Sequence, residues 1–169
     1  MTSSRPYEPD AVDWRLLAEL QADARVSFNE LSRRVHLSAP AVAERVRRMQ
    51  EAGVIAGYRA SVDPAAVGQG VRAFVQLRCR PGACLLRTTS EADYPEVAAI
   101  HRLSGEHCTL IEVRATDLAH FEGVVERLGT HGELRTHIVL STQYEGRPVG
   151  PLDTHRPVTP SAGWSNRGA

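Results

Sequence analysis

The length, composition and charge of the chain set the first limits on its fold and function. Its 169 residues are 42% hydrophobic and 24% charged, which suits one large core or two small ones in series. The 20 basic residues, all of them Arg, equal the 20 acidic residues, which excludes a polybasic protein whose whole surface binds phosphate. A basic patch on one face remains compatible with this balance. Three cysteines at irregular spacing are too few for a disulfide framework.

The sequence shows no targeting or membrane-spanning segment. Residues 1–10 are polar, contain proline and lack the apolar core of a secretory signal. No apolar run approaches the roughly 18 to 20 residues that a spanning helix needs. We therefore expect a cytoplasmic, reduced and soluble protein with no membrane partner.

Changes in composition and periodicity divide the chain into segments. The expected segments are a flexible N-terminus (residues 1–9), a helical domain (10–57), a linker (58–69), a mixed domain (70–145) and a tail (146–169). The tail is rich in Pro, Gly, Ser and Thr and is expected to be disordered, although Trp164 offers one aromatic side chain that could dock.

Residues 10–57 have the pattern of three short helices. Asp10 can cap the first helix, and Ser27 followed three residues later by Glu30 predicts a capping box at the second. Ser38 caps the third helix, which ends at Gly53. The apolar residues at helical spacing, which should share one core, are Val12, Leu16, Leu17, Leu20, Phe28, Leu31, Val35, Val42, Val46 and Met49.

The second and third helices have the arrangement of a helix-turn-helix motif. They are separated by a very short turn, and a rotation of about 100° per residue places Ala41, Arg45 and Arg48 on one outward sector of the third helix. Two short helices joined in this way, the second carrying outward Arg, are typical of DNA-binding domains. Residues 54–58 then read as a short extended segment, either a wing or the start of the linker.

The third helix is the predicted DNA reader. A helix fits the major groove, and its capped start brings backbone amides near a phosphate. Arg side chains can reach phosphates or guanine edges and small apolar ones thymine methyl groups, whereas the helix has no Asn, so DNA shape should supply part of the specificity. The predicted DNA contacts are Ser38, Ala39, Ala41, Val42, Arg45, Arg47 and Arg48. A merely solvated helix surface is the alternative, and the near-equal numbers of Arg and acidic residues in this domain favour neither.

Residues 70–145 alternate strand, helix, strand, strand, helix, strand. The expected strands are 71–79, 97–103, 109–115 and 134–142, and the expected helices are about 83–93 and 117–129. This βαββαβ order predicts a ferredoxin-like α+β domain with both helices on one sheet face. Alternation places His101 on the core-facing side of its strand. The uncovered face should carry four apolar residues among polar ones: Phe74, Ile100, Leu110 and Val139. Such a face usually meets a partner, and a second copy is the simplest one.

A helix-turn-helix domain followed by a βαββαβ domain resembles the Lrp/AsnC family, the feast/famine regulators. The resemblance covers about Asp10 to Tyr144 and is longest in the helical domain. The segments that carry it are residues 13–21, 23–25, 30–32, 35–38, 44–49 and 53–58, then the shorter matches 95–97, 103–105 and 135–140.

The resemblance implies a cytoplasmic transcription regulator that binds double-stranded DNA. It also implies homodimers formed through the sheets, often assembled into octamers, and a small effector, usually an amino acid, at the loop between the second and third strands. By position, the implied effector residues are Ser104, Gly105, Glu106, His107 and Cys108, with Arg135 and Thr136 at the start of the last strand as a second wall.

The loop departs from the family pattern. Members typically have Gly-Asp-aromatic-Asp, whereas this chain has Gly105-Glu106-His107-Cys108. Glu106 still offers a carboxylate for an α-amino group, but a thiol replaces the second carboxylate. This departure points to a changed effector specificity or to no effector.

Two other interpretations of the same residues stay open, although we expect neither a metal nor any other cofactor. A zinc-like ion could be held by residues at irregular spacing: His101, His107 and Cys108 with His131 or His137. Alternatively, His107 could activate Cys108 as a redox-sensing thiol, and Cys79 could pair with Cys84 on oxidation.

An enzyme is the main rival class of protein. The chain has no Gly-rich phosphate loop, no nucleophile elbow and no paired-carboxylate signature, and a Cys–His pair would leave the helix-turn-helix unexplained. We therefore expect no enzymatic activity. A further alternative is a non-DNA, small-molecule-binding module whose helical domain docks protein. Salt dependence separates the two, because DNA binding weakens steeply with salt.

Overall fold

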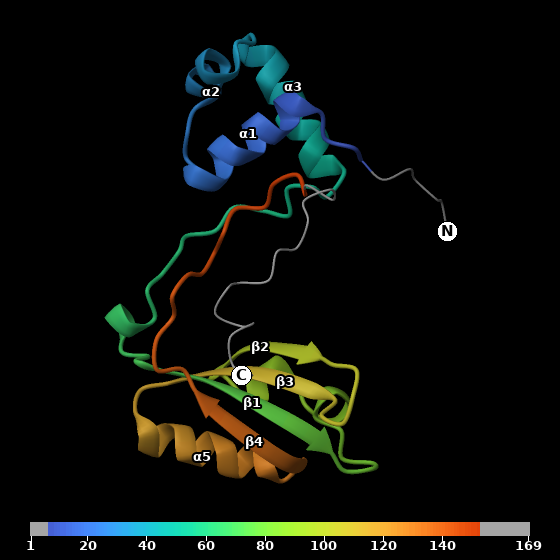
Figure 1. The fold of residues 1–169 in the computed structure, drawn as a ribbon, viewed down its shortest axis with the longest axis vertical. Coiled ribbons are helices and arrows are strands. Elements are labelled where there is room, and N and C mark those ends of the chain that lie inside the picture. The colour runs from blue at the N-terminus through green and yellow to red at the C-terminus, as the bar shows by residue number, and fades with distance from the viewer. Residues whose placement is uncertain (1–6, 153–169) are drawn as a thin grey trace, which may run out of the picture. The chain divides into compact units, whose positions relative to one another are not determined.

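The computed structural model describes residues 7–152, apart from the side chain of Glu91 (Figure 1). Two compact units are present: Met1–Arg59 together with Gly146–Ala169, called the helical unit, and Ala60–Glu145, called the sheet unit. Most of the expected tail, residues 153–169 with Trp164, and the first six residues of the expected flexible N-terminus lie outside the described residues.

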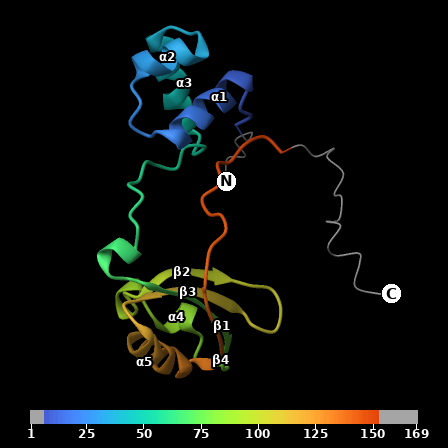
Figure 2. The same cartoon turned by 60° about the vertical axis from the view of Figure 1, so that its left-hand side comes forward.

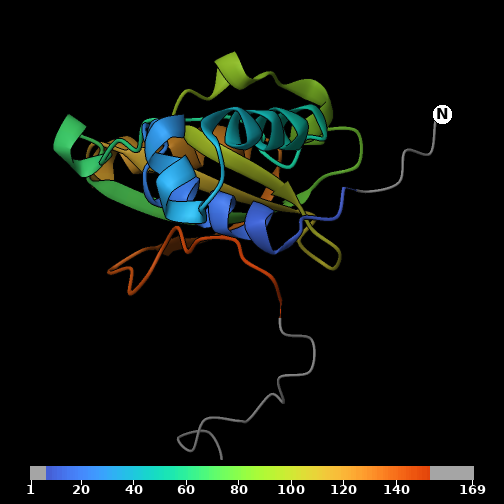
Figure 3. The same cartoon turned by 90° about the horizontal axis from the view of Figure 1, so that it is seen from above.

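The helical unit contains the three predicted helices, α1 (Ala11–Ala22), α2 (Phe28–Val35) and α3 (Ala39–Glu51). Side chains that cap the first turns fix where they begin: Asp10 on α1, Ser27 on α2 and Ser38 on α3. A second view of the three helices is given in Figure 3. The residues following α3 form no strand, so the alternative of a wing over Val54–Tyr58 is wrong.

The reciprocal capping box lies on α1 and not, as predicted, on α2. Asp10 accepts from the backbone of Asp13, and the Asp13 side chain accepts from the Asp10 amide at 3.1 Å. On α2, Ser27 accepts from the Glu30 amide at 3.2 Å, but the Glu30 carboxylate turns to Arg33 and Arg34. An arginine one turn away therefore outcompetes the cap for that carboxylate.

The turn between α2 and α3 is tight because His36 adopts a left-handed conformation, with φ of 57°. The Leu37 amide then returns to the Ser32 carbonyl at 3.0 Å. The fully buried side chains of the helical unit come from all three helices and are Leu16, Leu31, Val42, Val46 and Met49. One apolar stripe per helix thus sets the orientation of α3.

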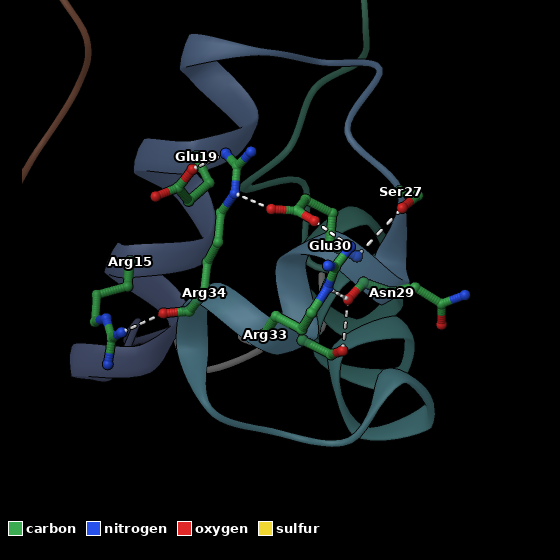
Figure 4. A network of polar contacts seen from close by, with 8 residues as sticks. Arg15, Glu19, Ser27, Asn29, Glu30, Arg33 and Arg34 are labelled. Atoms are coloured by element: carbon green, nitrogen blue, oxygen red, sulfur yellow. Dashed lines mark hydrogen bonds and ion pairs between the residues drawn. The ribbon is translucent and has the colours of Figure 1, made fainter.

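A polar network on the outside of the helical unit clamps α2 to α1 (Figure 4). The Arg34 guanidinium pairs with Glu19 of α1 at 2.6 Å and with Glu30 of its own helix at 3.0 Å. From the other side, Arg15 donates to the Arg34 carbonyl at 2.6 Å. Arg33 pairs with Glu30 as well. Arg34 and Arg15 therefore connect α2 to α1, whereas Arg33 pairs only within its own helix.

The sheet unit is an antiparallel sheet of four strands in the order β2-β3-β1-β4 (Figure 1). The strands are β1 (Val71–Cys79), β2 (Val97–Arg102), β3 (Thr109–Ala115) and β4 (Gly132–Ile138). Helices α4 (Leu85–Thr88) and α5 (Leu118–Gly129) supply Leu85, Phe121, Val124 and Leu128 to the core on one sheet face. This is the predicted ferredoxin-like arrangement.

Two predicted elements are shorter than expected. The helix expected over residues 83–93 is reduced to the single turn α4 and the 3-10 turn η2 (Glu91–Asp93), because Thr89 bonds back to the Leu85 carbonyl and Asp93 caps the Ser90 amide. The last strand ends at Ile138, and Leu140 beyond it is 95% exposed. A further 3-10 turn, η1 (Ala65–Val67), lies before β1.

A bulge in β2 reverses the predicted alternation of that strand. Val97 lies opposite Val113, but Ala99 lies opposite Glu112, so one extra residue is inserted between them. As a result Ile100 lies opposite the buried Ile111, and His101 lies opposite Leu110 on the other face. The expectations that His101 faces the core and that Ile100 lies on the uncovered face are therefore wrong, because a shift of one residue exchanges the two faces.

Candidate nucleic-acid interface and effector loop

Helix α3 exposes one flank while the other closes the core of the helical unit. Ser38 Oγ accepts from the Ala41 amide at 3.4 Å, and Pro40 occupies the first turn. Ser38 is exposed and Ala39 and Ala41 are half-buried, so all three are accessible at the start of the helix. Val42 is completely buried, which contradicts its prediction as a contact for a thymine methyl group.

Arg45 is engaged inside the protein. Its Nη1 lies 2.7 Å from Asp10 Oδ2 and 2.8 Å from Asp13 Oδ1, and Asp13 is only 3% exposed. Tyr7 completes the cluster by donating to Asp13 Oδ2 at 2.9 Å. Hydrogen bonds to Asp10 and then Asp13 raise the pKa of Arg45, and the backbone bond from Asp13, followed by the bond from Arg45, lowers the pKa of Asp10. The arginine predicted to read DNA thus joins α3 to the start of α1.

Arg47 and Arg48 differ from Arg45 because both are exposed. Arg47 pairs with Glu44 at 2.7 Å and with Glu51, both on its own helix. Such exposed pairs contribute little and exchange readily for a phosphate. The Arg48 side chain makes no hydrogen bond or ion pair with the described residues 7–152, so its guanidinium is available without breaking such a contact.

The loop that connects β2 and β3 can be followed in Figure 2. A backbone hydrogen bond at its base and the conformation of Gly105 determine its shape. The Leu103 amide donates to the Cys108 carbonyl at 2.8 Å. Gly105 has φ of 117°, a conformation that side chains rarely adopt, although a Cβ there would meet no atom within 4 Å. Backbone conformation, and not crowding, is therefore what requires glycine in the loop.

The predicted effector residues of the loop have different partners. Glu106 and Arg78 form an exposed pair at 3.3 Å. The Nε2 atom of His107 is buried and has no hydrogen-bond partner among the described residues. Ser104 is exposed, and Cys108 Sγ donates to the Leu77 carbonyl at 3.5 Å. The loop thus offers one replaceable carboxylate and one unsatisfied ring nitrogen.

Arg135 and Thr136 cannot both line one wall of a site. Arg135 lies opposite Gln76 and Thr136 opposite the buried Val75, so successive residues of β4 point to opposite faces. Arg135 shares the uncovered face with His101, in a row that crosses Leu110 and Gln76. Thr136 is exposed on the helix-covered face, so its role as an effector contact stays a prediction.

Cys79 lies within hydrogen-bonding reach of Cys84 and Cys108, but the cysteine and histidine residues form no metal site in the described part of the chain. No group of three or more metal-ligating side chains is found among the described residues. His131 already uses both ring nitrogens, contacting the Ala83 carbonyl at 3.2 Å and the Tyr94 hydroxyl at 3.0 Å. Burial raises the pKa of Cys79 to about 11, whereas the hydrogen bond with Thr109 lowers the pKa of Cys108.

Comparison with known proteins decides the family. The AsnC-type helix-turn-helix domain matches residues 10–50, and the Lrp/AsnC ligand binding domain matches residues 72–149. The chain belongs to the Lrp/AsnC family. It is therefore a DNA-binding transcription regulator with a ligand-binding domain, as the resemblance implied, and the family consists of regulators and not enzymes.

Relatives of known name support this assignment to Lrp/AsnC. The HTH-type transcriptional regulator Rv2324 of Mycobacterium tuberculosis is 37% identical over 144 residues, covering 82% of this chain and 97% of the relative. The leucine-responsive regulatory protein of Rhizobium meliloti is 41% identical over 125 residues, covering 72% of this chain and 80% of the relative.

Solved Lrp/AsnC structures share the fold over nearly their whole length. The M. tuberculosis feast or famine regulatory protein complexed with L-methionine is 33% identical with a TM-score of 0.76, covering 85% of this chain and 100% of that one. Bacillus subtilis LrpC is 26% identical with a TM-score of 0.75, and the match covers 80% of this chain and 97% of LrpC. A Neisseria meningitidis regulator in complex with L-methionine is 27% identical with a TM-score of 0.71, and the match covers 85% of this chain and 97% of that one.

The uncovered sheet face of this Lrp/AsnC chain is mixed in character, as predicted apart from Ile100. Arg72 pairs with Glu112 at 2.8 Å, and its guanidinium carbon lies 5.5 Å from the centre of the Phe74 ring. Leu110 and Val139 are half-buried on the same side. No helix within the described residues is long and apolar enough to cross a membrane.

Proposed function

We propose that this Lrp/AsnC regulator binds the major groove of double-stranded DNA with the outward flank of α3. Ser38, Ala39 and Ala41 lead the helix into the groove, and Arg47 and Arg48 reach phosphates or guanine edges. The observation that carries the proposal is that Arg48 is exposed and without a partner in the described chain, on a helix whose opposite flank is fully buried. Arg45 holds α3 in its orientation through ion pairs with Asp10 and Asp13.

The test starts from a random duplex library, from which the protein itself selects its operator sequence. The full chain selects its preferred sequences, and fluorescence anisotropy then compares wild type with Arg48→Ala on selected and scrambled duplexes over a salt series. If Arg48 contacts one phosphate, affinity falls on all sequences and the slope of log affinity against log salt drops by about 0.9. If it reads guanine, discrimination at one base pair falls by about 1–3 kcal/mol.

Arg33→Ala is the matched control, because Arg33 is an exposed arginine of the same unit paired with Glu30. It removes the same charge from a helix that is not the proposed reader. Equal effects of the two substitutions would show that only net charge matters and would overturn the assignment of Arg48. Binding that does not depend on salt would favour a module without a DNA function.

The second part of the proposal is self-association through the uncovered sheet face. The support is the half-buried apolar set Phe74, Leu110 and Val139 in a sheet whose other face is covered by helices. A symmetric dimer buries this set and brings two α3 helices to one duplex. Further assembly into octamers is the family expectation. Because its partner is chromosomal DNA, we place the regulator in the cytoplasm.

The third part of the proposal is an amino-acid effector at the β2–β3 loop. Two structures similar to this chain hold L-methionine. Glu106, free to leave its exposed pair with Arg78, is the group proposed to receive an α-amino group, and His107 offers an unsatisfied nitrogen nearby in the loop. Cys108 in place of a carboxylate favours an effector other than that of a typical member, and a thermal-shift screen over the amino acids identifies it.

A further inference from the structure

An apolar groove lies on the helical unit, away from the proposed DNA-binding flank. It has a volume of about 400 Å³, and its walls come from α1 and from the segment that follows α3. The lining residues from α1 and its C-terminal turn that matter here are Trp14, Leu17, Leu20 and Gln21. No residue of α3 lines it, so an occupant of the groove does not compete with DNA for α3.

Gln21 holds a backbone peptide of the C-terminal segment at the edge of this groove. Its Oε1 accepts from the Val149 amide at 2.7 Å, and its Nε2 donates to the Val149 carbonyl at 2.9 Å. The same Nε2 lies 3.1 Å from the Leu17 carbonyl, which fixes the direction of the carboxamide. This two-point contact recognises an extended backbone without regard to its side chains, as an added strand would.

The segment that Gln21 holds is extended and supplies apolar side chains. Gly146–Leu152 contains no helix or strand, and it belongs to the helical unit although it follows β4 of the sheet unit. In Figures 1 and 2 this red end of the described chain runs beside α1. Val149 is itself part of the groove lining but still 72% exposed, and Leu152 is 88% exposed. Apolar area is thus available on both the groove and the segment.

We propose that the groove is the docking site of the chain's own segment Gly146–Leu152, bound in cis as an extended peptide with Gln21 as its backbone clamp. Docking gives the DNA-binding unit a second attachment to the sheet unit, in addition to the linker before β1. This attachment begins directly after β4, the strand that carries Arg135.

The fluorescence of Trp14, which lines the groove, reports on docking in a chain that contains no other tryptophan. The chain has two, and a chain ending at Leu152 lacks Trp164 but keeps the docking segment. A second chain ending at Glu145 lacks the segment as well. We expect the emission of Trp14 to shift to longer wavelength, and its quenching by acrylamide to increase, in the chain ending at Glu145 relative to the chain ending at Leu152.

A peptide added in trans tests the specificity of the groove. A synthetic peptide with the sequence of residues 144–152 should restore the Trp14 signal of the chain ending at Glu145 in a saturable way. Gln21→Ala removes both bonds to Val149 and should weaken the binding of the peptide about 5-fold or more. Gln69→Ala makes the same chemical change at an exposed site outside the groove and should leave it unchanged.

The outcomes separate the proposal from its rivals. Identical Trp14 spectra in the two shortened chains, with no response to the peptide, overturn it. A Trp14 signal in the chain ending at Leu152 that depends on protein concentration means that the segment comes from a second copy, which overturns docking in cis. None of these readouts uses DNA, so a failure of docking is distinguishable from a failure of the proposed function.

Discussion

Arg45 Nη1 and Asp13 Oδ1 lie 2.8 Å apart and join α3, the helix proposed to bind DNA, to the first turn of α1. The carboxylate is buried, and it also accepts from Tyr7 and from the Asp10 amide. A charge held in this way is costly to leave without its partner. The orientation of α3, on which the presentation of Arg48 depends, thus rests partly on an arginine that is paired within the protein.

Arg45→Ala should therefore act on stability first. It leaves the Asp13 carboxylate without its cation and should lower the free energy of unfolding by about 1–3 kcal/mol. Urea denaturation measures this, with Arg48→Ala as the control that should stay within about 0.5 kcal/mol of wild type. An Arg45→Ala chain of unchanged stability that has lost DNA affinity would instead make Arg45 a direct DNA contact.

The Asp10 carboxylate should make stability depend on pH in the acidic range. Its folded pKa is lowered from the ordinary value of 3.8, first by the backbone bond from Asp13 and then by Arg45. A carboxyl with a depressed folded pKa contributes stability that is fully present above its unfolded pKa and is lost as the pH falls through the folded pKa. Asp10→Asn keeps a capping oxygen but removes this dependence.

Urea unfolding at pH 7 and below pH 3.8 makes the comparison. The difference in stability between wild type and Asp10→Asn should be largest at pH 7 and should shrink at the acidic pH, because protonation removes the charge from wild type too. A difference that stays constant or grows on acidification would show that the Asp10 charge contributes nothing to folding.

The uncovered sheet face can be tested with a single charge. Phe74→Glu places a carboxylate in the centre of the proposed dimer interface, where burial without a partner is unfavourable, and should convert the protein to monomers. Sedimentation equilibrium measures the mass, and circular dichroism checks that the fold is retained. Phe28→Glu is the matched control, because Phe28 is 45% exposed on α2, and should keep the mass of wild type.

Local sequence signals predicted most of the fold, and tertiary contacts account for what they missed. The caps at Asp10 and Ser38 and the strict alternation of β1 and β3 are properties of neighbouring residues, so they are readable in the sequence. The bulge after Val97 is not, because one additional residue in an edge strand leaves no compositional trace. The engagement of Arg45 depends on Asp10, 35 residues away, which helical periodicity alone cannot reveal.

Gly105→Val tests the effector loop. Its φ of 117° is unfavourable for a β-branched residue, so the substitution should rearrange the loop from Ser104 to Cys108 while leaving the sheet intact. The screen over the amino acids, which includes L-methionine, identifies the effector. In Gly105→Val the thermal shift that this effector produces should be lost, and the sedimentation mass should not change.

Gly123→Ala is the control, because this helical glycine has no positive φ and a Cβ there meets no atom within 4 Å. Alanine there should raise stability by about 0.5–1 kcal/mol and keep the response. A full response in Gly105→Val would place the effector site elsewhere on the sheet unit.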